Sequence, residues 1–230
     1  MENLGKAAVA EFVATFALIF IGAGAVVLAA GTGQLDLVGI ALAHGLVLAI
    51  VVSVTGHLSG GHVNPAVTIA LWSAGRVSTI RGAVYVAAQL LGAVVGALLL
   101  RYVAGSQLFD NGGGGTPALG LGVTGGRGIV IEAILTFFLV FAVFGTAVDD
   151  RGPWNKTAGF TIGLVIAFDI LAFGPYTGAA MNPARWFGPA LVSGQWSDAV
   201  VWIVGPIAGG VIAGVLYTMV FIRGKEPVTP

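Results

Sequence analysis

Two short stretches of the sequence bring an asparagine, a proline and an alanine together inside a strongly apolar background. The first is GGHVNPAVT, with Asn64 as its asparagine, and the second is GAAMNPARW, with Asn182 in the same place. Asparagine is a good N-cap residue, and proline suits the first helical position because its missing N–H is not needed there. Each triplet therefore predicts the start of a helix whose first turn carries an amide side chain.

The composition indicates that these helices lie in a membrane. The chain has 230 residues, of which 57% are hydrophobic and 9% are charged, and its mean hydropathy is +0.98. A soluble domain has about 25% charged residues, so an integral membrane protein is predicted. The formal net charge of zero offers no electrostatic support for a nucleic-acid partner. Since the chain has no cysteine and only three histidines, no metal or cofactor site is expected.

The lengths of the apolar stretches predict six crossings and two half-crossings. A helix needs about 20 apolar residues to cross the hydrocarbon core. Two pieces, starting at Asn64 and Asn182, run for only about ten residues. Irregular backbone at membrane depth survives only where protein buries it or water lines it. The predicted class is therefore an all-α membrane protein with two re-entrant half-helices, a water-filled path and six transmembrane helices, at about 8–30, 37–55, 82–104, 129–148, 158–174 and 199–222.

The two halves of the sequence resemble each other. EFVATFALIFIGAG returns later as EAILTFFLVFAVFG, which pairs Glu11 with Glu132 at an offset of 121 residues, and Asn64 pairs with Asn182 at an offset of 118. We therefore expect one transmembrane channel domain over 1–230, built from internal repeats at approximately 1–110 and 127–230. Each repeat has an odd number of spans, so the second is inverted and the two half-helices meet near the bilayer midplane.

The meeting of two helix N-termini predicts a selective path. Each N-terminus carries about half a positive charge, and the amide N–H groups of Asn64 and Asn182 are expected to point into the path. A water molecule that accepts from both donors cannot also donate along the file, so water passes while cations and protons do not. Backbone carbonyls of the segments before each asparagine are expected to line the rest of the path, at Gly60, Gly61, His62, Gly178 and Ala180.

These motifs resemble the aquaporins, the major intrinsic protein family. The match covers nearly the whole chain, and SGGHVNPAVT and YTGAAMNPAR are highly specific for it. The resemblance implies a homotetramer with one pore per subunit and passive flow across a lipid bilayer, without enzymatic activity. It extends to Arg185, to Glu11 and Glu132, and to both motifs, Asn64, Pro65, Ala66 and Asn182, Pro183, Ala184.

The resemblance also implies a constriction toward the outer face. Its four positions fall on His44, Ile170, Ala179 and Arg185. The strict water filter of the family has an aromatic residue at the first position and a histidine at the second. Here the histidine is first and an aliphatic residue is second, a departure that resembles the tonoplast intrinsic subgroup. Strict water selectivity is therefore in doubt, and ammonia and urea are open as additional permeants.

Two further positions bear on glycerol, the alternative permeant. Glycerol-conducting members of the family carry an aspartate directly after the filter arginine and a second basic residue further on. This chain has Trp186 and Ala190 there, which favours a water channel over a glycerol or small neutral solute facilitator.

Polar residues inside the spans have functional and structural interpretations. Arg185 is expected to face the pore, because an unpaired guanidinium at membrane depth is costly. His44 is expected in the filter, and protonation of a histidine in mild acid would give a pH-dependent permeability. His62 is expected to contribute its carbonyl to the path, with a structural ring. The role of Asp169 is left open between bracing the outer vestibule and selectivity.

The two buried glutamates also suggest chemistry at first sight, since paired carboxylates serve proton relays in transporters. Their symmetry, and the family resemblance, favour a structural role instead. Glu11 and Glu132 are expected to accept hydrogen bonds from backbone N–H groups of the re-entrant loops, and Gln89 is expected to brace the same loops.

Basic residues predict the orientation in the membrane. The termini and the loops after the second and fourth spans hold seven, against three on the other side, so both termini are expected to be cytoplasmic. The plasma membrane is the expected location, with a vacuolar membrane left open by the filter. The seven are Lys6, Arg76, Arg81, Arg151, Lys156, Arg223 and Lys225, and the three are Arg101, Arg127 and Arg185.

Two other function classes receive little support. A secondary transporter also uses inverted repeats and broken helices, but it needs an ion-binding constellation, for which only Asp169 and the two glutamates are available. An enzyme needs a nucleophile–base pair or a metal set, and neither is visible.

Overall fold

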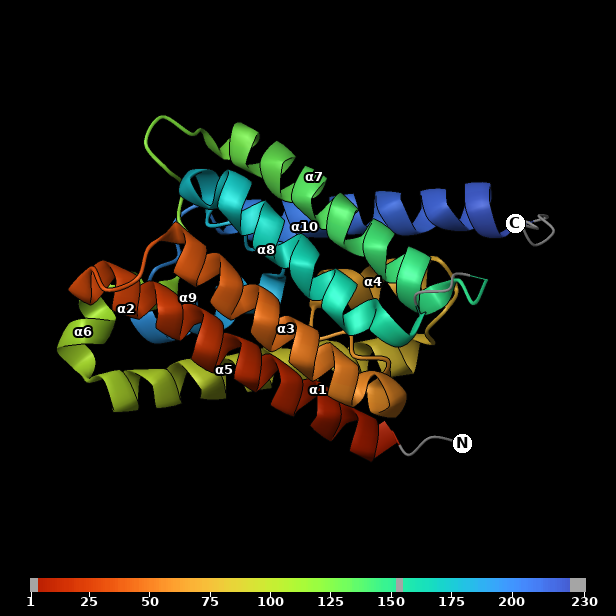
Figure 1. The fold of residues 1–230 in the computed structure, drawn as a ribbon, viewed down its shortest axis with the longest axis horizontal. Helices are drawn as coiled ribbons and strands as arrows, with labels where there is room; N and C mark the ends of the chain where they lie inside the picture. The colour runs from red at the N-terminus through yellow and green to blue at the C-terminus, as the bar shows by residue number, and fades with distance from the viewer. Residues whose placement is uncertain (1–3, 152–154, 224–230) are drawn as a thin grey trace.

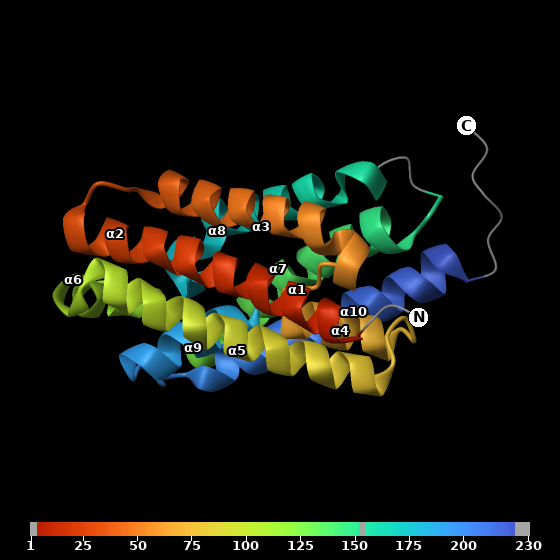
Figure 2. The ribbon, with the colours of Figure 1, turned by 90° about the horizontal axis from the view of Figure 1, so that it is seen from below.

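A computed structural model describes residues 4–151 and 155–223, and the regular structure within these ranges is entirely helical. Six segments are long and apolar enough to cross a membrane, as predicted. They pack side by side as a bundle, with the shorter helices among them (Figures 1 and 2). The elements are α1 (Leu4–Leu18), η1 (Ile19–Ala23), α2 (Gly24–Thr32), α3 (Leu37–Ser59), α4 (Pro65–Ser73), α5 (Thr79–Ala104), α6 (Ser106–Asn111), η2 (Gly113–Gly115), α7 (Gly125–Val143), η3 (Phe144–Val148), η4 (Asn155–Thr157), α8 (Ala158–Thr177), α9 (Pro183–Ser193), α10 (Ala199–Tyr217) and η5 (Thr218–Ile222).

Several helices begin earlier than hydropathy predicts, because polar side chains cap them. Ser78 accepts from the backbone N–H of Arg81 and starts α5, whereas the apolar run starts at 82. Thr124 accepts from the N–H of Arg127 and starts α7 in the same way. A side chain that satisfies a free N–H extends a helix into residues that hydropathy alone excludes.

The two short helices α4 and α9 start at the predicted positions. The Oδ1 atom of Asn64 accepts from the N–H of Ala66 at 2.8 Å, and that of Asn182 accepts from the N–H of Ala184 at 2.9 Å. The helices contain 9 and 11 residues, half of a crossing, so the predicted architecture of six spans and two half-helices is confirmed.

Equivalent helices of the two halves pack in equivalent ways. α1 lies against α5 as α7 lies against α10, and α4 contacts α10 as α9 contacts α5. α3 and α8 are a further close pair that joins the halves. They cross where Gly45 faces Gly163, since a Cβ on Gly163 would lie 2.3 Å from the Gly45 carbonyl oxygen. Only glycine permits this approach, which is the usual way that membrane helices pack closely.

The segment between α5 and α7 is more ordered than its loop-like sequence predicts. Residues 106–111 form the short helix α6, which packs against α2 and α5. Its Phe109 side chain is fully buried, and the Arg101 guanidinium lies 5.7 Å from that ring. One buried aromatic residue thus folds a glycine-rich segment down onto the bundle.

Both ends of the described chain lie at the same end of the bundle (Figure 2). Basic residues predicted for this side flank the helix ends found there, and Lys225 lies outside the described residues. The carboxylate of Asp149 accepts from Arg151 at 2.6 and 2.8 Å and from the Tyr217 hydroxyl at 3.3 Å. Hydrogen bonding from Arg151 lowers the pKa of Asp149 below its ordinary value, so this clamp stays charged at neutral and mildly acidic pH.

The α3–α8 crossing can be tested by adding one methyl group. We expect Gly163→Ala to lower the free energy of unfolding by about 1–3 kcal/mol, the usual result of overpacking. The matched control is Gly56→Ala on α3, where a Cβ meets nothing within 4 Å. Thermal unfolding in detergent, followed by circular dichroism, measures both variants. Equal melting temperatures would show that the crossing tolerates a side chain.

Candidate functional site

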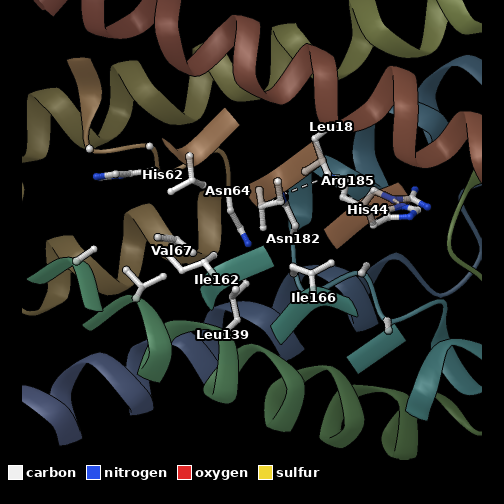
Figure 3. A pocket seen from close by; sticks show the side chains of 18 of the residues that line it. Leu18, His44, His62, Asn64, Val67, Leu139, Ile162, Ile166, Asn182 and Arg185 are labelled. Carbon is white, nitrogen blue, oxygen red and sulfur yellow. Dashed lines mark hydrogen bonds between the residues drawn. The ribbon is translucent and has the colours of Figure 1, made fainter. Parts of the chain in front are cut away.

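A narrow cavity runs along the axis of the bundle between the two halves. Its free volume is about 40 Å³, room for only a few water molecules. Figure 3 shows His62 at one end, Asn64 and Asn182 in the middle, and His44 with Arg185 at the other end. Aliphatic side chains form the walls between these polar levels, among them Leu18, Val67, Leu139, Ile162 and Ile166.

The two asparagines are tied to each other's loops. Asn64 Nδ2 donates to the carbonyl of Met181 at 2.8 Å, and Asn182 Nδ2 donates to the carbonyl of Val63 at 3.1 Å. The sequence predicts that the amide N–H groups point into the path. In the structure, one N–H of each asparagine donates to the opposite loop instead. Because Oδ1 is held by the helix N-terminus, the amide orientation is fixed. Each amide has a second N–H, and both side chains line the cavity.

The loops that precede the asparagines have unusual backbone conformations. Val63 and Met181 lie in the left-handed region, with φ of 58° and 52°, and Ala179 has φ of 44°. Such conformations cost about 1–3 kcal/mol each for residues other than glycine. At Val63 and Met181 the backbone N–H donates to a buried glutamate, while the carbonyl accepts from an asparagine amide. Strong acceptors behind the loops are needed to hold them.

Glu11 supplies those acceptors for the first loop. It is fully buried, and it accepts from the backbone N–H groups of His62 at 2.9 Å and Val63 at 2.6 Å. The Ser59 hydroxyl and the Gln89 amide donate to the same carboxylate at 2.6 and 2.8 Å. All four partners are donors, which suits a carboxylate because it only accepts.

Glu132 holds the second loop in the matching way. It accepts from the N–H groups of Ala180 at 3.0 Å and Met181 at 2.7 Å, and from the Thr177 hydroxyl at 2.7 Å. These donors follow Ser59, His62 and Val63 by 118 residues, the offset between the two asparagines. Gln89 contacts only the first carboxylate, and its Oε1 atom finds no hydrogen-bond partner in the described parts of the chain.

Two aromatic residues complete this network and escaped the sequence analysis. The Tyr85 hydroxyl donates to the Ser59 carbonyl at 2.8 Å, and Trp202 Nε1 donates to the Thr177 carbonyl at 3.0 Å. Their separation of 117 residues is close to the repeat offset. That offset is the signal by which they can be found, since their residue types differ.

His44 and Arg185 are joined at one end of the cavity. Arg185 Nε donates to His44 Nε2 at 3.0 Å, and the Nδ1 atom of the same ring lies 2.9 Å from the Ile40 carbonyl. A neutral ring with its proton on Nδ1 satisfies both contacts. Arg185 Nη1 donates to the carbonyl of Gly115 at 2.7 Å. Ile170 and Ala179 line the same cavity, so all four residues assigned to the filter by resemblance are among its lining residues.

Gly115 was also missed by the sequence analysis. It lies in η2, in a run of four consecutive glycines, and this run is the only hint in the sequence that backbone approaches another group there. Its carbonyl reaches Arg185 because α6 folds the segment down onto the bundle.

His62 combines two roles. Its Nδ1 atom lies 3.0 Å from the Thr68 hydroxyl, and its ring meets Tyr85 edge to face, as expected for a structural ring. The residue nevertheless lines the cavity together with Gly60, Gly61 and Ala180.

The remaining predicted residues lie away from the cavity lining. Gly178 caps α8 by donating to the Gly174 carbonyl at 2.8 Å, and its carbonyl on the path stays a prediction. Asp169 is buried, and its Oδ2 atom has no partner among the described residues. The prolines and alanines of the two triplets are buried in the first turns of α4 and α9, namely Pro65, Ala66, Pro183 and Ala184.

Two residues that bear on glycerol lie in a separate hydrophobic cluster with Trp202, namely Trp186 and Ala190. Within residues 4–151 and 155–223, no group of acidic or histidine side chains is placed to hold a metal ion.

Comparison with known proteins places the chain among channels. The family model described as Major intrinsic protein matches residues 2–217. Aquaporin TIP4-4 of Zea mays is 46% identical over 96% of this chain and 90% of its own length. Aquaporin TIP2-3 of Arabidopsis thaliana is 42% identical over 97% of this chain and 90% of its own length. Among solved structures, the aquaglyceroporin from Plasmodium falciparum superposes with a TM-score of 0.85 at 27% identity, covering 96% of this chain and 98% of that one.

The carboxylate of Glu132 can be tested by an isosteric change. In Glu132→Gln an NH₂ group replaces one acceptor, so at least one buried donor of the second loop loses its partner, at a cost of about 1–3 kcal/mol. We expect a lower melting temperature and reduced flux through the cavity. Asp110→Asn is the matched control, because that side chain is 56% exposed. Wild-type stability and flux in Glu132→Gln would show that the loop holds its conformation without the carboxylate.

Proposed function

The chain belongs to the major intrinsic protein family, and we propose that it is a water channel whose single-file pore is the cavity between α4 and α9. It is a passive channel of a multi-pass membrane protein, for water or small neutral solutes, and not an enzyme. The observation that carries the proposal is the narrow cavity, in which polar groups recur at three levels between aliphatic walls.

Water passage follows from the spacing of donors and acceptors. The second N–H groups of Asn64 and Asn182 donate to the oxygen of a water molecule at the centre, and carbonyls of the two loops accept from water on either side. Aliphatic walls offer no competing partner, so each molecule moves from one polar level to the next with little cost. Selectivity in this family depends in general on the diameter of the pore and on the groups that line it.

The exclusion of cations follows from the positive electrostatic potential inside the cavity. The N-termini of α4 and α9 both point at the centre of the cavity, and each contributes about half a positive charge. Arg185 adds a full charge at one end. A cation therefore meets repulsion at two levels, and a water molecule bound to both asparagines interrupts proton transfer.

Ammonia and urea are proposed as additional permeants because of the filter composition. Ile170 is aliphatic, Ala179 is small, and the polar groups of the constriction are His44 and Arg185. The alternative of a glycerol facilitator is less well supported. The similarity to an aquaglyceroporin concerns the fold, and Trp186 and Ala190 occupy the positions at which glycerol conductors carry an aspartate and a basic residue.

We further propose that residues 1–230 form one channel domain with inverted repeats near 1–110 and 127–230. The paired contacts of Glu11 and Glu132 support this duplication. A homotetramer with cytoplasmic termini is proposed from the family and from the distribution of basic residues. The mass of the detergent-solubilised particle and the protease accessibility of terminal tags test these two points. The expected plasma-membrane location has no support, since the relatives are TIP-type proteins.

Reconstitution in liposomes tests the main proposal. After a shock with an impermeant osmolyte, stopped-flow light scattering should show shrinkage well above that of empty liposomes, with a low activation energy. Ammonia, urea and glycerol gradients applied to the same vesicles then define the solute range. Flux that depends on a proton or sodium gradient, or shrinkage equal to that of empty liposomes from folded protein, would contradict a passive water channel.

A pH series tests whether His44 acts as a gate. Both ring nitrogens are occupied in the neutral form, and a proton on Nε2 would face the Arg185 guanidinium. We therefore expect water permeability to be flat between about pH 5 and 8, although the ordinary pKa of histidine is about 6.5. The clamp between Asp149 and Arg151 also stays charged over this range. A sigmoidal change that disappears in His44→Ala would establish the gate.

A further inference from the structure

The His44 ring rests on a residue that has no side chain. Gly22 is buried in η1, the π-helical turn Ile19–Ala23 of the first span. A Cβ at this position would lie 2.6 Å from Cδ2 and 2.7 Å from Nε2 of His44. Carbon atoms in van der Waals contact are about 3.5–4.0 Å apart. The ring therefore occupies space that only glycine leaves open.

The ring cannot yield to a methyl group without loss of its contacts. Its Nδ1 atom is held by the Ile40 carbonyl at 2.9 Å, and its Nε2 atom accepts from Arg185 at 3.0 Å. His44 lines the cavity whereas Gly22 does not, so Gly22 lies behind the ring. A methyl group there would push the ring toward the path and move Nε2 from its position beside Arg185.

The next residue of the same turn supports the second partner of Arg185. A Cβ on Gly115 would lie 2.6 Å from the carbonyl oxygen of Ala23 and 2.8 Å from its Cβ. The Gly115 backbone thus sits directly on Ala23, while its carbonyl accepts from Arg185 Nη1 at 2.7 Å. Two neighbouring residues of one π-helical turn therefore place both groups that hold the guanidinium. Turns of this kind occur frequently at functional sites.

The other half of the chain lacks this arrangement. Val143 follows Gly22 by 121 residues, the offset between the two buried glutamates. It carries a side chain, and that side chain lines the cavity itself. The space for a filter histidine therefore exists at only one end of the path.

We propose that Gly22 is a positioning residue of the filter, and that η1 sets the width of the constriction by seating His44 and Gly115 against Arg185. The proposal rests on the water-channel function proposed above. It assigns a selectivity role to a turn that contributes no atom to the filter itself.

Gly22→Ala tests the proposal in reconstituted vesicles. We expect water permeability per channel to fall roughly tenfold, the result of a barrier about 1.4 kcal/mol higher. The matched control is Gly24→Ala, two residues further on, where a Cβ meets only Leu100 Cδ1 at 3.4 Å. The control should conduct as the wild type does. Equal permeabilities for the two variants would overturn the proposal.

A double-mutant cycle separates positioning from general damage to the helix. In a His44→Ala background the ring is gone, so Gly22→Ala should have no further effect on permeability or on the melting temperature. If Gly22→Ala alone fails to assemble, assembly of the double variant still supports the contact. Additive losses, or failure of both variants, would show that Gly22 acts independently of His44.

The same measurements distinguish failure of this proposal from failure of the channel function. Wild-type vesicles that shrink no faster than empty liposomes would contradict the water channel. In that case the melting temperatures of the cycle still report whether Gly22 and His44 are coupled.

Discussion

The structure depends on two buried carboxylates that hold two strained loops. Glu11 and Glu132 capture the backbone N–H groups of Val63 and Met181, which lie in the left-handed region. The carbonyls of the same two residues accept from the asparagine amides of the opposite loop. The two asparagines that line the cavity therefore sit on loops held by carboxylates that lie outside the cavity lining. The apolar helices supply the rigid frame that such a conformation requires.

This arrangement explains why a chain with so few charges keeps several of them at membrane depth. Glu11, Glu132 and Arg185 are each matched to several directed partners rather than to one counter-ion. Arg185 is shared between an imidazole nitrogen and a backbone carbonyl, and each glutamate is shared among hydroxyl, amide and backbone donors. The carboxylates stabilise the loops, while the guanidinium faces the cavity with its remaining donors. Position in the network, and not residue type alone, decides which charge is structural.

Much of this was accessible from the sequence, and the exceptions have physical reasons. Hydropathy and the two Asn-Pro-Ala triplets predicted the spans and half-helices, because both signals are local. The pairing of Glu11 and Glu132 followed from the repeat offset. Gly115, Tyr85 and Trp202 were missed because their roles depend on backbone carbonyls, which every residue has. The asparagine amides differ from expectation because each loop offers an acceptor to the other half. Gly60 and Gly178 both form left-handed helix caps, and only Gly60 is among the residues that line the cavity.

The crossed hydrogen bonds of the asparagines have a consequence for biosynthesis. Asn64 finds its acceptor at Met181, and Asn182 finds its acceptor at Val63. A ribosome must therefore add more than a hundred residues after the first loop before that loop can be completed. A chain that ends before the second loop can form neither of the two crossed hydrogen bonds. The first loop therefore reaches its final hydrogen bonds only after the second loop has been inserted beside it.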